Sequence, residues 1–175
     1  MNTGTIFATE AKQEQRSILV LSPDGSIAPG TGTGSDITLL SLGGQQAARA
    51  SVAAESVFTV TLPDAEPTDL TMDGTDASDN GIPLTIAGGD PAVAELFLLE
   101  FRLDDTEVGN ATVTQDGTDP FKYDIAPDFG ETDVEFGIGA TISTDDSNDG
   151  GSAGDPGASY EQGTYEGTFE VTAEF

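Results

Sequence analysis

The sequence predicts an all-β sandwich of about eight to ten strands, and three observations lead to this fold class. Glycine, threonine and aspartate are plentiful, and the apolar runs are short and separated by turn residues, which favours many short strands over helices. Residues 163–175 alternate strictly between small or apolar and polar side chains, as in a strand with one face on a core and one in water. A length of 175 residues suits one domain with a real core.

The individual strands are expected where apolar runs are bounded by turn-forming residues. Residues 16–22 form a β-branched and leucine run that ends at Pro23-Asp24-Gly25, and a flexible stretch rich in glycine, threonine and proline follows at 27–35. Further strands are expected at residues 36–42, 56–62, 69–72, 82–87, 110–115, 121–125 and 134–143. The spacing of these runs is typical of a sandwich.

For two segments the sequence pattern fits both a helix and a strand. Residues 45–54 are rich in alanine and fit a short helix or an edge strand, and we favour the strand. The apolar positions of residues 92–103 fit a buried strand or a helical segment. We take residues 96–103 as a strand because their neighbours in the sequence are strands.

The charge of the chain excludes two classes of partner. With 32 acidic and five basic residues the formal net charge is −27. Binding to nucleic acid or to anionic lipid needs a cationic surface, so the sequence predicts neither. A folded surface of roughly 8,000 Å² places the net charges about 17 Å apart, beyond the Debye length of about 10 Å at 0.1 M salt. The charge therefore favours solubility, and a saline habitat is an additional expectation.

The residue inventory gives no support to an enzyme. The chain has no histidine and no cysteine, so the commonest general base and thiolate chemistry are absent. Paired acids such as Asp104-Asp105 are adjacent on loops rather than held across a cleft, as glycosidases require. No apolar stretch reaches the length of a membrane span, and no signal peptide is visible. We predict no catalytic residues, no cofactor and no membrane insertion.

Two Asp-rich loops are the candidate metal sites. Each carries oxygen ligands at alternate positions followed by a glycine, like the first half of a calcium loop, but Ala87 and Pro156 stand where the closing acid belongs. Aspartate in turns also bonds its own backbone. We expect solvated loops, with weak calcium binding as the alternative. The candidate ligands are Asp76, Ser78, Asn80, Asp145, Ser147 and Asp149.

The C-terminal segment, residues 163–175, carries the residues that we single out for a structural role. One face of it comprises Gly163, Tyr165, Gly167, Phe169, Val171, Ala173 and Phe175. The pattern Gln162-x-x-Tyr165-x-Gly167-Thr168-Phe169-x-Val171, preceded by residues 136–142, resembles a bacterial family of unknown function related to spore coat protein U and Mat-type fimbrial subunits. Residues 27–30 and 58–63 look like its early and middle blocks, so the resemblance covers residues 16–175.

The resemblance implies an immunoglobulin-like, pilin-like sandwich that lacks one strand, with an N-terminal donor strand that fills the groove of the next subunit. Residues 1–15 are then the extension and residues 16–175 the sandwich domain, with a donor at 3–13. The acceptor groove is expected between the terminal strand, Thr164–Phe175, and the strand that starts near Arg16. The expected inward face of the donor is Thr3, Thr5, Phe7, Thr9 and Ala11, although Ile6 competes with Phe7. The alternatives are pairing within the same chain and a frayed terminus.

The function expected from these observations is structural. A secreted subunit would polymerise with copies of itself, head to tail, into a filament on the cell surface. The resemblance implies a periplasmic chaperone and an outer-membrane usher as partners. The alternative is a monomeric secreted binding module, directed at carbohydrate or matrix and weakly calcium-dependent, that uses the Asp-rich loops.

Overall fold

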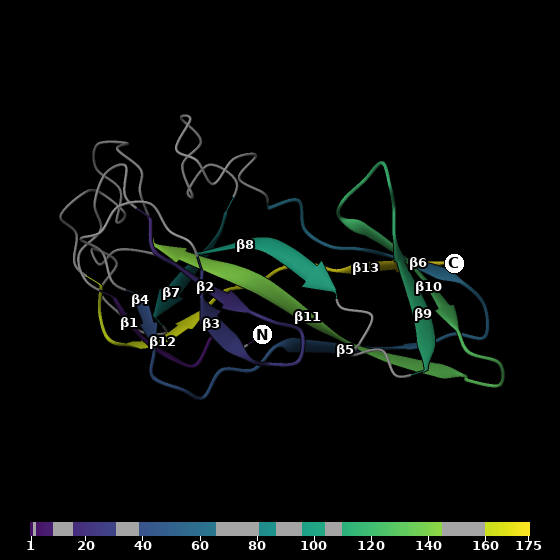
Figure 1. Ribbon diagram of the computed structural model, residues 1–175, viewed down its shortest axis with the longest axis horizontal. Helices are drawn as coiled ribbons and strands as arrows, with labels where there is room; N and C mark the ends of the chain where they lie inside the picture. Colours follow the sequence, from purple (N-terminus) through teal and green to yellow (C-terminus); the bar gives the residue numbers. More distant parts are fainter. Residues whose placement is uncertain are drawn as a thin grey trace.

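A computed structural model describes residues 1, 3–8, 16–30, 39–65, 81–86, 96–103, 110–144 and 160–175. Within this part of the chain every regular element is a β-strand, so the all-β prediction is confirmed. Thirteen strands form two sheets (Figure 1), more than the eight to ten expected. The excess arises because short strands occur where the sequence suggested coil and because the C-terminal strand is divided.

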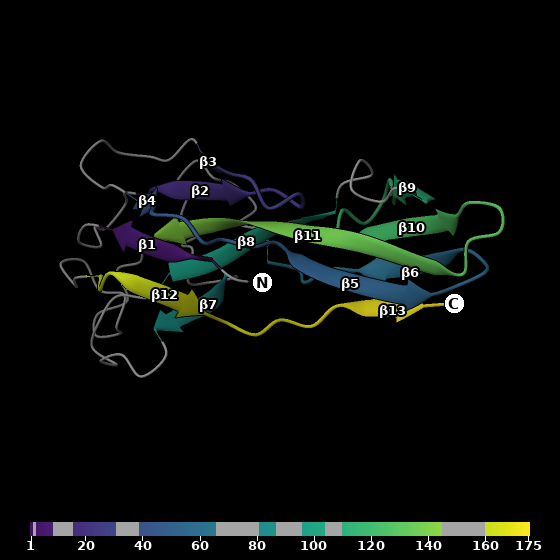
Figure 2. The ribbon, with the colours of Figure 1, turned by 90° about the horizontal axis from the view of Figure 1, so that it is seen from below.

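The larger sheet has nine strands, all paired antiparallel. Its order is β3 (Ile27–Pro29), β2 (Ile18–Leu21), β11 (Asp133–Thr144), β8 (Leu96–Leu103), β7 (Ile82–Ile86), β12 (Gly163–Glu166), β1 (Thr5–Ala8) and β4 (Leu39–Ser41), while β5 (Ala48–Ala53) pairs with β11. In Figure 2, β11 runs along most of the molecule.

The smaller sheet has four strands and packs against one end of β11 and β5 (Figures 1 and 2). Its order is β13 (Thr172–Glu174), β6 (Phe58–Thr61), β10 (Lys122–Pro127) and β9 (Ala111–Gln115). One buried cluster joins the two sheets. Phe58 and Ile125 from the smaller sheet belong to it together with Phe136 and Ile138 of β11. The described part of the molecule is therefore a two-layer sandwich.

Two glycines let the turn after β2 cross the face of β11. A side chain at Gly137 would meet the carbonyl oxygen of Pro23, and one at Gly139 would meet that of Leu21. Any larger residue would push the turn away from the sheet. The alternating glycines within residues 136–140 therefore have a packing role.

Several strand predictions are confirmed. Residues 96–103 form β8 with the expected bounds, and the alanine-rich segment is the strand β5 rather than a helix. Residues 27–29, expected to be flexible, form β3 and pair with β2. The strand expected at 69–72 lies outside the described residues. Among those that are described, no helix is long and apolar enough to cross a membrane.

The C-terminal segment is not the single strand that its alternation predicted. β12 lies in the larger sheet between β7 and β1, whereas β13 lies in the smaller sheet against β6. Residues 167–171 connect the two sheets outside either ladder (Figure 2). At Gly167 an added Cβ would lie 2.8 Å from the carbonyl oxygen of Pro83, so the chain passes close to β7 where it leaves the sheet.

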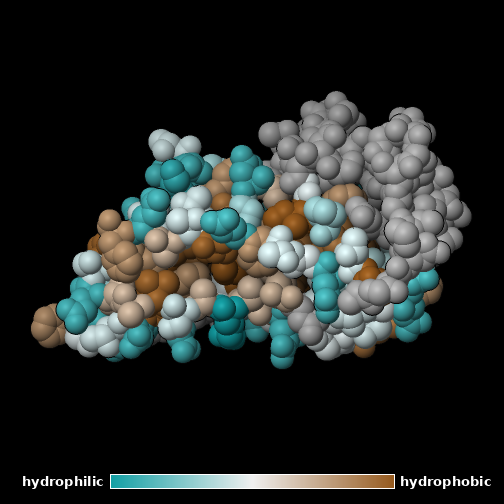
Figure 3. All heavy atoms as spheres, turned by 180° about the vertical axis from the view of Figure 1, so that it is seen from behind, coloured by the Kyte–Doolittle hydropathy of each residue, from teal (hydrophilic) through white to brown (hydrophobic). Residues whose placement is uncertain are grey.

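The face expected to be inward is therefore only partly buried. Tyr165 is 2% exposed and lies in the core, and the Phe169 ring packs at a tilt against the Phe101 ring with a centroid distance of 4.8 Å. Ala173 is exposed, and Phe175 is 79% exposed. The back of the molecule (Figure 3) accordingly shows apolar side chains among polar ones over its described residues.

Candidate functional site

The strand β1 lies in the sheet of its own chain, between β12 and β4 (Figure 2). Thr5 pairs with Thr164 and Ile6 with Gly163 on one side, and Phe7 pairs with Leu40 on the other. Residues 3–8 therefore pair within their own chain, which is the alternative given above to donation of the strand to another subunit. Thr9 and Ala11 lie outside the described residues. We call the space that β1 fills between β12 and β4 the exchange slot.

The face of β1 that points into the core is opposite to the one expected. Ile6 is fully buried and Ala8 is buried, whereas Phe7 is 41% exposed and Thr5 is half-buried. Thr3 is buried although it shares the sequence phase of Phe7. Gly4 explains this change because its φ of 71° is left-handed, which breaks the alternation between Thr3 and the strand.

Gly4 also fixes β1 against the turn that follows β4. A Cβ on Gly4 would lie 2.6 Å from the amide nitrogen of Gln45 and from the carbonyl oxygen of Gly43. Because glycine has no Cβ, the two backbones can approach closely. The Thr5 amide donates to the carbonyl of Gly43 over 3.0 Å, and the Leu42 amide donates to the carbonyl of Thr5 over 2.8 Å. Only glycine satisfies both the backbone angle and the close approach.

On its other side β1 is anchored to β12. The Thr3 hydroxyl donates a 2.9 Å hydrogen bond to the carbonyl of Tyr165, and this bond is buried. The Tyr165 hydroxyl donates to the carbonyl of Glu161 over 2.9 Å. Burial raises the pKa of Tyr165 to about 12, and the carboxylate of Glu161 acts in the same direction, while the hydrogen bond opposes the shift. Tyr165 is therefore a neutral, fixed wall of the exchange slot at physiological pH.

The outer surface beside the exchange slot is apolar. Phe7 on β1 and Leu40 on β4 are paired residues, and both are exposed, as is Leu42 just beyond β4. Large apolar side chains on the solvent face of strands at the margin of a sheet commonly mark contact surfaces. The sequence prediction missed this feature because it placed Phe7 in the core.

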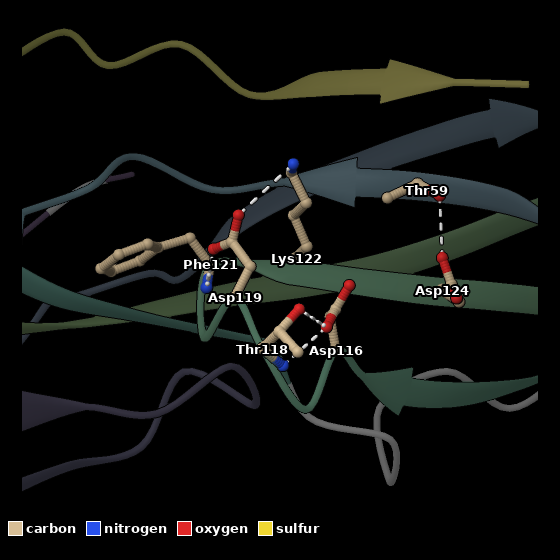
Figure 4. A network of polar contacts seen from close by, with 7 residues as sticks. All are labelled: Thr59, Asp116, Thr118, Asp119, Phe121, Lys122 and Asp124. Atoms are coloured by element: carbon tan, nitrogen blue, oxygen red, sulfur yellow. Dashed lines mark hydrogen bonds and ion pairs between the residues drawn. The ribbon is translucent and has the colours of Figure 1, made fainter.

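Two aspartates in the turn between β9 and β10 accept hydrogen bonds from the backbone of that turn. Asp116 accepts hydrogen bonds of 2.7 Å from the amide and the hydroxyl of Thr118, and Asp119 accepts one of 3.1 Å from the Phe121 amide (Figure 4). The bonds from Thr118 lower the pKa of Asp116. In the same network Lys122 and Asp119 form an ion pair of 3.3 Å.

The calcium prediction concerns other loops, which lie outside the described residues. Asp76, Ser78, Asn80, Asp145, Ser147 and Asp149 belong to this group. In the part of the chain that is described, no three of the residues His, Cys, Asp and Glu come together as a metal site. Weak calcium binding stays a prediction.

Comparison of the chain with protein-family models, with curated proteins and with solved structures finds no match. The resemblance to spore coat and fimbrial subunits therefore rests on the motifs of the sequence alone.

Proposed function

We propose that this protein is a structural subunit of a filament on the cell surface, and that it polymerises head to tail by exchange of β1. The strand β1 of one copy would occupy the exchange slot of the next. The observation that carries the proposal is the position of β1, which comes first in the sequence yet lies between two strands of the sheet. Its departure leaves an open place between β12 and β4 that only another strand can fill.

The energetics support exchange because the bound and the exchanged strand make the same contacts. In the intrachain form Ile6 is buried, Thr3 bonds to Tyr165, and β1 pairs with both β12 and β4. The same strand from another copy would make the same contacts. The monomer and the polymer then differ in the connecting segment and in protein concentration, as in domain swapping. The monomer described here is the self-complemented form in this proposal.

A subunit with an empty slot is costly. It loses the ladder bonds of β1, worth about 0.5–1.5 kcal/mol each, and the burial of Ile6, worth about 1.5–3 kcal/mol. Assembly would therefore need a partner strand throughout export, and a periplasmic chaperone with an outer-membrane usher would suit this need. The secreted, binding-module alternative depends on the Asp-rich loops and stays a second candidate.

The proposal is tested with a variant that lacks residues 1–8 and a synthetic peptide of the same residues. We expect the truncated protein to bind the peptide in a native gel and to regain thermal stability. A peptide with Ile6→Asp should fail because it places a charge in the core, whereas Phe7→Ser should bind because residue 7 faces solvent. The Phe7→Ser peptide is the matched control.

Polymerisation itself is measured on the full chain. After refolding at high concentration, size-exclusion chromatography and negative-stain microscopy should show linear polymers that the truncated protein does not form. A full chain that stays monomeric at every concentration, together with a truncated protein that ignores the peptide, would contradict the proposal.

A further inference from the structure

A cleft of about 600 Å³ opens between the two sheets, away from the exchange slot. It lies where β8 faces β9 and β10, which come from opposite layers (Figure 1). Its polar wall contains Glu100, Arg102, Gln115 and Tyr123, and its apolar wall includes Phe101 and Phe121. The volume lies within the range of sites for small ligands.

A β-bulge shapes one wall of the cleft. The register of β8 on β11 shifts between Gly139 and Thr141, so that Glu100 and Phe101 lie opposite one residue. Glu100 has a φ of 45°, which is left-handed and strained for a residue with a side chain. Its amide donates to the carbonyl of Ala65 over 3.1 Å rather than to the ladder. Bulges of this kind commonly redirect a side chain beside a functional site.

The bulge places a carboxylate and a guanidinium side by side. Arg102 Nη2 donates to Glu100 Oε2 over 2.6 Å and to the hydroxyl of Thr141 over 3.3 Å, and that hydroxyl donates to Glu100 Oε2 over 2.7 Å. Thr141 is fully buried, so its hydroxyl holds the side chains of Glu100 and Arg102 in place from the protein interior. The two formal charges cancel, so the charged side chains that line the cleft sum to zero within a chain of net charge −27.

The opposite wall adds a fixed amide and aromatic rings. Gln115 Nε2 donates to the carbonyl of Pro120 over 2.8 Å and to the Tyr123 hydroxyl over 3.4 Å. These bonds turn the amide nitrogen toward the protein and hold the side chain in place. The Phe121 ring belongs to the same wall and provides an apolar face beside the polar groups.

We propose that this cleft binds a neutral, polyhydroxylated ligand, namely the ring of a monosaccharide or short oligosaccharide. One hydroxyl of a vicinal pair can donate to the Glu100 carboxylate while its neighbour accepts from the Arg102 guanidinium. The apolar face of the sugar ring packs on Phe121. An anion would find the Arg102 guanidinium already paired with Glu100, and a cation would find the Glu100 carboxylate already paired with Arg102. An apolar ligand would displace the water that bonds to both charged groups without replacing its hydrogen bonds.

The test is a titration of the full, isotope-labelled chain with glucose, galactose, mannose, maltose and cellobiose, followed by amide NMR spectra. We expect at least one sugar to shift the amides of residues 100–102, 113–115 and 121–123 in a saturable way. Glu100→Gln should weaken this binding by roughly ten-fold or more because it removes a charged acceptor while keeping the shape. Gln115→Ala, at an exposed position, should weaken it as well and provides a second readout if the first variant folds poorly.

The matched control is Thr114→Ala, which alters the neighbouring exposed residue on β9, a residue that does not line the cleft. It should leave the titration unchanged. The proposal is overturned if no sugar shifts these amides at roughly 10 mM, a concentration that detects weak specific binding. It is also overturned if the shifts lie elsewhere, or if only a sulfated sugar binds, since the ligand would then be an anion.

Discussion

Glu100 is a single residue held in a strained backbone conformation inside a strand. A left-handed backbone costs about 1–2 kcal/mol for a residue with a Cβ, and glycine avoids this cost. Glu100 stays in this conformation with its carboxylate bonded to Arg102 and Thr141. These hydrogen bonds help to hold the residue in the left-handed conformation.

This interpretation predicts an unusual order of stability at position 100. Glu100→Gly should be more stable to urea than Glu100→Ala by about 1 kcal/mol, because glycine alone relieves the left-handed angle. At a regular strand position alanine is the more stable residue by about 0.5–1 kcal/mol, and that order at position 100 would refute the strained conformation.

Tyr165 gives the chain a defined response to high pH. Its pKa is raised to about 12 by burial, whereas an unfolded tyrosine ionises near 10. Between these values the unfolded chain loses a proton that the folded chain keeps, so the stability contributed by Tyr165 is complete below about pH 10 and falls as the pH rises toward 12. The loss is on the order of 2 kcal/mol.

Titration of tyrosinate absorbance measures this pKa. The folded protein should show one ionisation step near pH 12 that is missing in Tyr165→Phe, and the two proteins should converge in stability at high pH. If the substitution leaves the last ionisation step in place, burial of Tyr165 is not its cause.

At the scale of elements, the side chains on only one face of β1 pack into the core. Ile6 is fully buried and Phe7 is 41% exposed. We expect Ile6→Ala to lower the free energy of unfolding by about 2–5 kcal/mol, and Phe7→Ala to change it by less than about 1 kcal/mol. Urea denaturation of both variants measures the difference. Equal effects would place both residues in the core and contradict the observed phase.

The crossing of the β2 turn over β11 is equally specific. Gly139→Ala should destabilise the protein by about 1–3 kcal/mol, because the new methyl group meets the backbone of Leu21 and Pro23. Gly117 lies in the turn between β9 and β10 with no atom within 4 Å of an added Cβ, so Gly117→Ala is the control and should be neutral or slightly stabilising. Similar losses in both variants would show that the general backbone effect of replacing glycine, rather than crowding at Gly139, is being measured.

Strands with strong local patterns could be predicted from the sequence. The position of β11 follows from its apolar run, and the bounds of β8 follow from its apolar run together with the strand patterns on either side, which decide between strand and helix. The division of the C-terminal strand could not be predicted, because its alternation continues unbroken through residues 167–171. The sheet change depends on β7 and β6, which lie far away in the sequence, and on the close approach of Pro83 to Gly167.

The candidate sites were predictable to different degrees. The terminal strand with Tyr165 and the N-terminal strand were predicted from their patterns. For the inward face of β1 the sequence favoured Phe7 with Ile6 as the competitor, and the structure buries Ile6. The burial of Thr3 could not be predicted, because it depends on the backbone angle of Gly4. The cleft was not foreseen, since its walls come from β8, β9 and β10 and meet only in the folded sandwich. One signal was available. The polar residues Glu100 and Arg102 share the even-numbered phase of the apolar Leu96 and Leu98, and such a break in the alternation indicates a bulge.

At the scale of the whole molecule, charge is the dominant property. The accessible surface is 8537 Å² for a net charge of −27, which divides into about 316 Å² per net charge and a spacing of about 18 Å. The Debye length is about 30 Å at 0.01 M salt and about 10 Å at 0.1 M. Repulsion between neighbours is therefore felt at low salt and largely screened at 0.1 M.

The melting temperature should follow this dependence. Between about 0.01 M and 0.1 M sodium chloride it should rise by more than about 3 °C and then level off, because screening is then complete over the charge spacing. Differential scanning calorimetry measures the curve. A rise that begins only above about 1 M would indicate exclusion of salt from the surface and would contradict the electrostatic explanation.

The two ends of the described chain lie in very different surroundings. Met1 packs partly against the core beside residues 164–168, midway along the molecule, whereas Phe175 projects at one extremity (Figure 1). Any polypeptide fused ahead of Met1 would start next to the ladder that β1 forms and would hinder its release. An affinity handle or fluorophore appended after Phe175 would lie away from the ladder of β1. A fusion ahead of Met1 should therefore reduce polymerisation, whereas a fusion after Phe175 should not.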